Sequence, residues 1–347
     1  MSWLGLDIGG ANLKAANGYG WACVQPFELW RNPAGLAGAI DSLIQSGPSV
    51  SGLAVSMTGE LCDSFRTKRD GVRHILSAVE QVAGGRDVVV YLVDGRFVPI
   101  GQAQEAAHLA AASNWHALAQ FACRFISGGA GILVDIGSTT TDVIPLLDGR
   151  PVSRGFNDTD RLVAGELVYT GIGRTPVCAI TSWLPWRDGH CPVAAEYFAT
   201  AADAYVILGQ MFEREDFNGT GDGRPLTKQL SCERLARMIC ADSSIFGSSD
   251  AERAAVHVRD TQLAQLECAL ERVIANMDYR PEVCVLSGAG EFLAKACAVK
   301  LLPRTLVISL AEVLGPAVSI AAPAHALAVL SSEVELAEDG QSYDVKP

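Results

Sequence analysis

The sequence predicts an α/β protein made of two related domains that face each other across a cleft. Three observations lead to this fold class: the chain length, an internal repeat, and an alternation of strand-like and helix-like segments. The chain has 347 residues, and at roughly 100–200 residues per domain this length predicts two domains. Hydrophobic residues make up 49% of the sequence and charged residues only 19%, which excludes a disordered chain and supplies apolar side chains for two buried cores.

A strand–turn–strand pattern occurs twice in the chain. Residues 4–16 (LGLDIGGANLKAA) are echoed by residues 132–144 (ILVDIGSTTTDVI). Corresponding positions lie 128 residues apart, as Asp7 and Asp135 do. Each copy is followed by a dipeptide that is typical of tight hairpin turns, Asn17-Gly18 or Asp148-Gly149. We therefore expect each domain to open with three strands joined by tight turns.

Strand-like and helix-like segments alternate through the rest of the chain. Strands are expected at 51–58, 87–94 and 305–310, with a further strand and a glycine turn at 283–292. Helices are expected at 71–82, 104–112, 114–126, 160–168, 196–210, 232–240 and 250–277, and an exposed loop at 216–227. This order predicts an N-terminal domain over 1–130 and a C-terminal domain over 131–347. The second domain carries a helical insertion at about 160–275, and the last residues are expected to return to the first domain.

The charge and cysteine content limits the ligands and the compartment. The formal net charge of −12 argues against a nucleic-acid partner and an anionic membrane surface, because both require a basic face. Residues 313–330 contain no charged side chain, but their prolines and small residues predict a buried helical layer rather than a membrane span. The ten cysteines form no Cys-x-x-Cys pair, which favours free thiols and a cytoplasmic protein.

The two repeats have the residue types that bind phosphate. Small turn residues let backbone N–H groups approach an anion, and hydroxyl groups add further donors. A strand-end carboxylate repels phosphate but suits Mg²⁺, which neutralises phosphate charge. We expect Asp7 and Asp135 to act on the metal and Lys14 to contact a phosphate oxygen. The expected phosphate-binding residues are Gly9, Gly10, Asn12, Gly137, Ser138, Thr139, Thr140, Gly288 and Gly290.

Further charged residues near strand ends are candidates for contacts with a substrate. Glu60 and Asp63 follow a predicted strand, so either can serve as a general base. Arg174, like Lys68 and Arg69, can hold an anionic group, while a plain surface role stays open for all three. Asp94 and Asp142 are candidates for supporting roles. For four further side chains a structural role is the simpler interpretation: His74, Trp183, Trp186 and Phe198.

The repeats resemble the phosphate hairpins of the actin-like ATPase and sugar kinase superfamily, which implies two ribonuclease-H-like domains. The segment 134–143 (VDIGSTTTDV) and the segment 56–72 (SMTGELCDSFRTKRDGV) resemble the hydantoinase A/oxoprolinase group. Three further segments resemble a branch of this group that is linked to tetrahydromethanopterin-dependent one-carbon metabolism. These are 112–115 (ASNW), 165–176 (GELVYTGIGRTP) and 198–203 (FATAAD). In the second segment, Gly173 stands where a basic residue is expected.

This resemblance implies a transferase of methanofuran-type cofactor biosynthesis. Such an enzyme joins an aminomethyl-furan diphosphate to a tyramine-type acceptor, γ-glutamyl-tyramine, and releases diphosphate. The superfamily alone implies instead an ATP-dependent small-molecule kinase or a hydantoinase/oxoprolinase-like hydrolase, and a nucleotide-gated assembly protein is a third alternative. The transferase needs Mg²⁺ but not ATP. A kinase needs space for adenosine near residues 288–291. The sequence leaves open whether the chain forms a homodimer.

Overall fold

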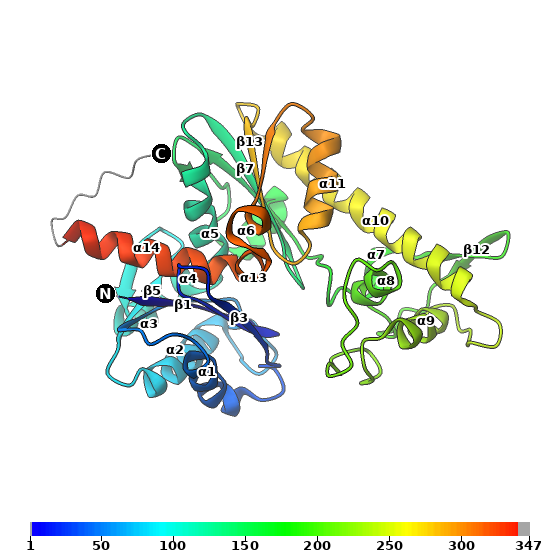
Figure 1. The fold of residues 1–347 in the computed structure, drawn as a ribbon, viewed down its shortest axis with the longest axis horizontal. Helices are drawn as coiled ribbons and strands as arrows, with labels where there is room; N and C mark the ends of the chain where they lie inside the picture. The colour runs from blue at the N-terminus through cyan, green and yellow to red at the C-terminus, as the bar shows by residue number, and fades with distance from the viewer. Residues whose placement is uncertain (1, 339–347) are drawn as a thin grey trace.

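Two mixed β-sheets organise the fold (Figure 1). The computed structural model describes residues 2–338. The first sheet has the strand order β3-β2-β1-β4-β5-β6, formed by β1 (Trp3–Ile8), β2 (Asn12–Ala16), β3 (Ala22–Pro26), β4 (Gly52–Met57), β5 (Asp87–Tyr91) and β6 (Phe97–Pro99). The second has the order β10-β8-β7-β13-β14, with β9 also beside β8. It is formed by β7 (Ala130–Ile136), β8 (Thr141–Leu147), β9 (Arg150–Pro151), β10 (Leu167–Val168), β13 (Val283–Ser287) and β14 (Leu306–Ser309).

The sheets show that the sequence repeat is a structural repeat. In each, an antiparallel hairpin comes first (β1–β2 or β7–β8), and its first strand then pairs in parallel with a later strand, β4 or β13. The two-domain α/β fold is thus confirmed. The third strand expected in the second copy is present as β9, but it has only two residues. This two-residue strand leaves room on β8 for β10, which pairs through Leu167 and Val168.

Helices of the first domain flank its sheet. They are α1 (Leu36–Gln45), α2 (Lys68–Val82), α3 (Ile100–Glu105), α4 (Ala107–Ala110) and α5 (Asn114–Ala122). The Thr67 hydroxyl accepts a hydrogen bond from the backbone N–H of Asp70 and caps α2. The single helix expected over 104–112 is instead split at Ala106, whose φ of −92° and ψ of 37° lie outside the helical region.

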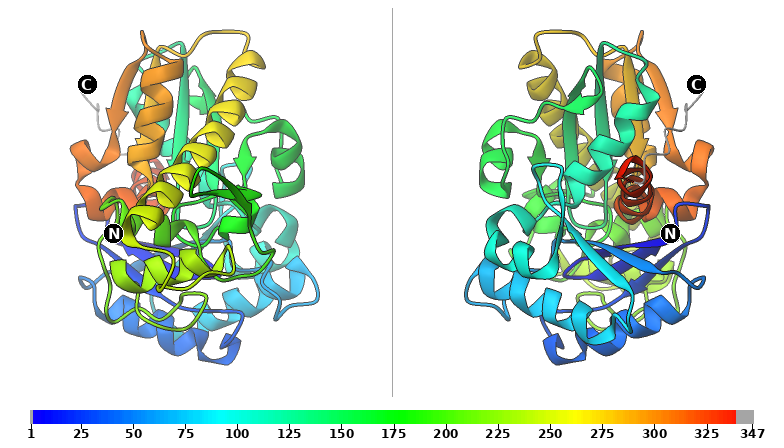
Figure 2. Two further views of the ribbon diagram at one scale, coloured as in Figure 1. Left: turned by 90° about the vertical axis from the view of Figure 1, so that its right-hand side faces the viewer. Right: turned by 90° about the vertical axis from the view of Figure 1, so that its left-hand side faces the viewer.

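The C-terminal helix α14 (Ala322–Glu338) packs between the two sheets, beside α5 (Figures 1 and 2). Gly5 makes this possible, because a Cβ there would lie 1.9 Å from the carbonyl oxygen of Ala324. Two short helices precede it, α12 (Leu310–Leu314) and α13 (Pro316–Ile320). The buried small-residue layer expected at 313–330 is present only in its second half: residues 321–328 are buried, whereas residues 313, 316, 317 and 320 are exposed. Across residues 2–338, no helix is long and apolar enough to cross a membrane.

A largely helical segment projects from the second sheet and is tied to it by α10 (Figure 1). Its elements are α7 (Val177–Ile180), β11 (Trp183–Trp186), β12 (Gly189–Pro192), α8 (Ala201–Ile207), α9 (Lys228–Arg237) and α10 (Ser248–Ala275), before α11 (Glu291–Leu301). The short helix α6 (Asp158–Ala164) lies apart from this segment, next to β10 of the second sheet. The expected helices 160–168 and 196–210 are shorter. Gly165, with φ 82°, ends α6. Asp203 accepts a hydrogen bond from the backbone N–H of Thr200 at the start of α8, and Gly209, with φ 69°, follows its end.

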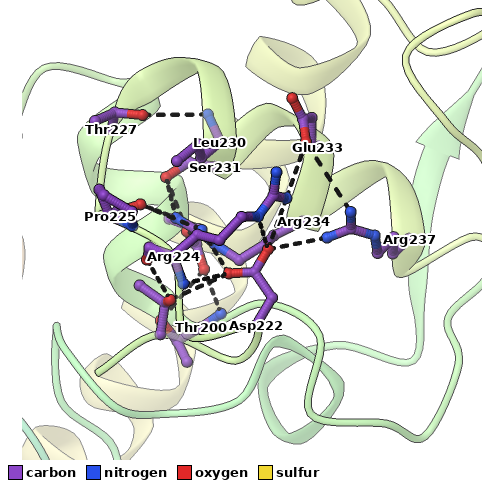
Figure 3. A network of polar contacts seen from close by, with 12 residues as sticks. Thr200, Asp222, Arg224, Pro225, Thr227, Leu230, Ser231, Glu233, Arg234 and Arg237 are labelled. Atoms are coloured by element: carbon purple, nitrogen blue, oxygen red, sulfur yellow. Dashed lines mark hydrogen bonds and ion pairs between the residues drawn. The ribbon is translucent and has the colours of Figure 1, made fainter. Parts of the chain in front are cut away.

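The loop at 216–227 is held by charges, although the sequence predicts it as an exposed loop (Figure 3). Asp222 accepts hydrogen bonds from Arg224, Arg234 and Arg237. Arg234 is fully buried and also donates to Asp203, 2.7 Å away. The network therefore joins the loop to both α8 and α9.

Candidate functional site

A cavity of about 390 Å³ lies where the turns of the two repeats meet. The β1–β2 turn and the β7–β8 turn line opposite parts of it. Other segments contribute to its wall: residues 58 and 61–63 after β4, residue 112 before α5 and residue 114 at its start, Asp158 and Arg161 on α6, and residues 167, 169 and 174. The repeat thus brings two predicted phosphate turns to one space, as the sequence analysis expects.

Asp7 and Lys14 form the first half of the site. They are direct partners in the β1–β2 ladder, and the Lys14 Nζ lies 3.5 Å from the Asp7 Oδ2. Asp7 is 2% exposed, and its other oxygen, Oδ1, is buried without a hydrogen-bond partner among residues 2–338. An unpaired buried carboxylate oxygen is costly unless a ligand or an ion satisfies it. This oxygen is therefore a candidate contact for a ligand or an ion.

Asp135 and Asp142 form the second half and are partners in the β7–β8 ladder. Ser287, at the end of β13, donates a hydrogen bond of 2.6 Å to Asp135. Burial raises the pKa of Asp135 to about 6, and the nearby Asp142 adds to the rise while Lys14 opposes it. Lys14 therefore acts on carboxylates of both domains.

Asp142 is itself paired with a buried arginine. Arg161 on α6 donates from Nη2 to Asp142 Oδ1, and its guanidinium carbon lies 4.1 Å from the ring centroid of Trp115. Burial raises the pKa of Asp142, and the charge of Arg161 opposes this shift. The Arg161 Nε has no hydrogen-bond partner among the described residues. A cation with a spare donor thus borders the cavity.

The two turns have the same backbone geometry. The N–H of Gly9 donates to the carbonyl of Asn12 at 3.0 Å, and the N–H of Gly137 donates to that of Thr140 at 2.9 Å. Gly10 and Asn12, together with Ser138, Thr139 and Thr140, line the cavity as expected.

Gly173 explains the departure from the family pattern. Its N–H and that of Arg174 both donate to the carbonyl of Ser138 at 2.9 Å. A Cβ at Gly173 would lie only 2.3 Å from the Ser138 hydroxyl. A side chain at position 173 would therefore force the Ser138 hydroxyl to move. Arg174 does line the cavity, and its guanidinium carbon lies 4.2 Å from the ring centroid of Trp30 in the first domain.

Glu60 lies behind the cavity wall rather than on it. It is 1% exposed, and its Oε2 has no hydrogen-bond partner in the part of the chain that the structure describes. Burial raises the pKa of Glu60 to about 7, against the effects of a backbone hydrogen bond and of Lys68. The Lys68 Nζ lies 3.9 Å from the Glu60 Oε1 and 2.8 Å from Asp158 Oδ2, which lines the cavity. The competing base Asp63 lines the cavity directly.

Four predicted contact residues are not on this cavity. Lys68 and Arg69 line a neighbouring one. The Gly290 N–H donates to the carbonyl of Ile136, and a Cβ at Gly288 would lie 2.4 Å from that same carbonyl oxygen. Both glycines therefore allow β13 and α11 to approach β7 closely.

Several other side chains have structural contacts. Trp183 contacts the rings of His190 and His257, and Trp186 stacks on Phe246. Phe198 packs on the core of the second domain. His74 bonds the Pro33 carbonyl, and Asp94 pairs with Arg96.

The sequence analysis missed three residues of the site: Arg161, Ser287 and Trp30. Arg161 resembles an ordinary surface residue of a short helix, and only its partner Asp142 reveals its role. Ser287 offered a signal, because it ends a strand directly before the Gly288 turn.

Two carboxylates of the cavity have the chemistry to hold a magnesium ion. Within residues 2–338, no three His, Cys, Asp or Glu side chains are grouped to hold a metal by themselves. Mg²⁺ usually keeps several waters and takes one or two carboxylates together with substrate phosphate. The unpaired oxygen of Asp7 and the facing carboxylate of Asp135 fit that demand.

Comparisons with known proteins agree with this arrangement. The family model for hydantoinase/oxoprolinase matches residues 52–334. The chain belongs to this family. A relative from Methanocaldococcus jannaschii is 34% identical over 94% of this chain and 96% of its own length. It is a (4-{4-[2-(gamma-L-glutamylamino)ethyl]phenoxymethyl}furan-2-yl)methanamine synthase. The synthase of the same name from Methanococcus vannielii is 31% identical over 57% of this chain and 89% of its own length.

A structural comparison supports the family's fold. Nucleotide-free acetone carboxylase, from a structure on ATP-dependent acetone carboxylation, aligns with a TM-score of 0.56 at 13% identity. The alignment covers 94% of this chain and 70% of that one. At this identity the likeness is one of fold.

Proposed function

We propose that this protein is a transferase that joins an aminomethyl-furan diphosphate to the phenol of γ-glutamyl-tyramine and releases diphosphate. The product is the furan methanamine ether that gives the relatives their name. The proposal is supported by the sequence similarity to these synthases together with one structural observation. The predicted phosphate turns of both repeats line the same cavity. Such a cavity suits a diphosphate leaving group.

The leaving group takes up negative charge as its bond to carbon breaks, so donors aimed at it accelerate the reaction. The N–H groups and hydroxyls of the two turns supply neutral donors, and Lys14 supplies a positive charge. Asp7 and Asp135 would hold Mg²⁺. When bound, Mg²⁺ neutralises the diphosphate and stabilises its departure. The buried carboxylates alone would repel the substrate, which explains why Lys14 stands between the two domains' acids.

The acceptor's phenol must lose its proton as it reacts. The phenol oxygen forms a bond to the furan-bound CH₂ carbon, while the bond from that carbon to the diphosphate oxygen breaks. The electron pair of that bond leaves with diphosphate. The phenolic proton passes to a carboxylate base, either directly to Asp63, which lines the cavity, or through an intervening water to Glu60 behind its wall. A carboxylate with a pKa of about 7 is well matched to this task near neutral pH.

The position of the glycine turn at 288–290 favours this function over ATP chemistry. A kinase needs space for adenosine there, but Gly290 is packed against the side chains of Ile136 and Ile172. Neither of the two cavities near the hairpin turns is lined by residues 288–291.

The test is an assay of the purified protein with Mg²⁺, the furan diphosphate and γ-glutamyl-tyramine, and in parallel with ATP. Diphosphate is measured by a coupled assay and the ether by mass spectrometry. We expect equal amounts of ether and diphosphate, with loss of both in Asp7→Asn and Asp135→Asn. Glu312→Gln is the matched control, because it removes an exposed carboxylate on α12. ATP turnover without ether formation would refute the proposal.

A further inference from the structure

A second cavity, of about 410 Å³, adjoins the first. Ala112 lines both of them. Lys68 lines the second cavity and is bonded at 2.8 Å to Asp158, which lines the first. An ion pair between α2 and α6 therefore stands at the border, and a ligand longer than one cavity can extend into the other beside it.

The second cavity presents charges of both signs that have no partners. Arg69 and Glu105 both line it, both are exposed, and neither forms a hydrogen bond or ion pair within the described part of the chain. Lys68, in contrast, is already committed to carboxylates. A free cation and a free anion on one cavity match a zwitterion better than they match phosphate, because Glu105 would repel phosphate.

The acceptor of the proposed reaction is a ligand of this kind. The γ-L-glutamylamino group in the relatives' product is amide-linked through its side chain, so it keeps a free α-carboxylate and a free α-ammonium. The reacting phenol lies at the opposite end of the molecule. The start of α2 is packed directly on Glu60, as a Cβ at Gly71 would lie 2.2 Å from the Glu60 carbonyl oxygen. An acceptor with its phenol near Glu60 can therefore follow α2 towards Arg69.

We propose that the second cavity binds the α-amino-acid end of the acceptor, with its carboxylate on Arg69 and its ammonium on Glu105. This assignment rests on the proposed function and adds a specificity site to it. The enzyme then selects γ-glutamyl-tyramine over other phenols by charge recognition at a distance from the reacting oxygen. Arg69 can pair with a carboxylate through two parallel hydrogen bonds.

Calorimetric titration with γ-glutamyl-tyramine and with N-acetyltyramine, which lacks both charges, tests the assignment. Loss of a charged hydrogen bond corresponds to a weakening of about tenfold or more. Arg69→Ala should weaken the binding of γ-glutamyl-tyramine by this factor and leave the binding of N-acetyltyramine unchanged. Glu105→Gln should act in the same selective way. In the condensation assay, Arg69→Ala should raise KM with little change in kcat. Arg73→Ala is the matched control, an exposed arginine on the same helix that lines neither cavity.

Each outcome separates this proposal from the proposed function. If the wild type forms the ether and Arg69→Ala affects both ligands equally or neither, the second site is refuted and the transferase stands. If Arg69→Ala weakens the binding of inorganic diphosphate but not the binding of the acceptor, the cavity binds phosphate and the assignment is again refuted. A wild type that neither binds the acceptor nor forms the ether refutes both. Circular dichroism checks that each variant is folded.

Discussion

Lys14 and Asp142 occupy equivalent positions in the two repeats, and they carry opposite charges. Lys14 lies opposite Asp7 in the β1–β2 ladder, and Asp142 lies opposite Asp135 in the β7–β8 ladder. The duplicated hairpin therefore gives an asymmetric site. One domain contributes an acid with a cation, and the other contributes two acids that need Arg161 as an external partner.

Replacement of Lys14 by Met should abolish most activity, because Lys14 pairs with Asp7 and its charge also acts on Asp135. Loss of one charge-stabilising donor reduces kcat by roughly 10²–10³-fold. We expect Lys14→Arg to keep part of the activity, since it keeps the charge. Steady-state diphosphate release measures both. Equal loss in the two variants would show that the charge of Lys14 is not what matters.

Replacement of Glu60 by Gln should reduce activity and increase stability at alkaline pH. Burial raises the pKa of Glu60 from 4.5 to about 7. The folded protein therefore holds a proton that the unfolded chain loses, and this contribution to stability disappears as the pH rises through about 7. The shift corresponds to about 3 kcal/mol. In urea unfolding at pH 4 and pH 8, the free energy of unfolding of Glu60→Gln should exceed that of wild type only at pH 8.

The activity profile tests the role of Glu60 separately. Wild-type kcat should rise with pH and level off above about 7, the pKa of Glu60. In Glu60→Gln this rise should be absent. Asp63→Asn tests the competing base. If the rise of kcat with pH is lost in Asp63→Asn and kept in Glu60→Gln, then Asp63 is the base that takes the proton.

Replacement of Arg161 by Met should destabilise the protein by about 3–5 kcal/mol, because it leaves the buried Asp142 without its partner. Asp142→Asn combined with Arg161→Met should recover a large part of that loss. Unfolding free energies of the two single variants and the double variant form a double-mutant cycle. Additive effects would contradict a direct pairing of the two residues.

Asp222 should make the helical segment sensitive to acid. Burial alone would raise its pKa, but hydrogen bonds from Arg224 and the charge of Arg234 hold the pKa of Asp222 well below its usual value of 3.8. Its contribution to stability is therefore complete above pH 4 and is lost as the pH falls further. The stability difference between wild type and Asp222→Asn should shrink from pH 6 to pH 2. A constant difference in thermal unfolding would exclude this electrostatic contribution.

The repeat made the fold and the meeting of the two hairpin turns at one cavity predictable, because Asp7 and Asp135 stand in matching local patterns that can be read along one segment. Long-range contacts could not be read in this way. Arg161 acquires its role only when α6 packs beside Asp142, and Gly290 faces Ile136 rather than the cavity because α11 approaches β7. Glu60 was predicted at the cleft, but whether its side chain points into the cavity or behind its wall depends on the packing of α2.

The central claim is that the site displaces diphosphate at carbon and not at phosphorus. The most direct measurement uses γ-glutamyl-tyramine with ¹⁸O in the phenol, followed by mass spectrometry of both products. Attack of the phenol oxygen on carbon predicts that all of the label is in the ether and none is in the released diphosphate. Label in a phosphorylated acceptor or in diphosphate would contradict this account.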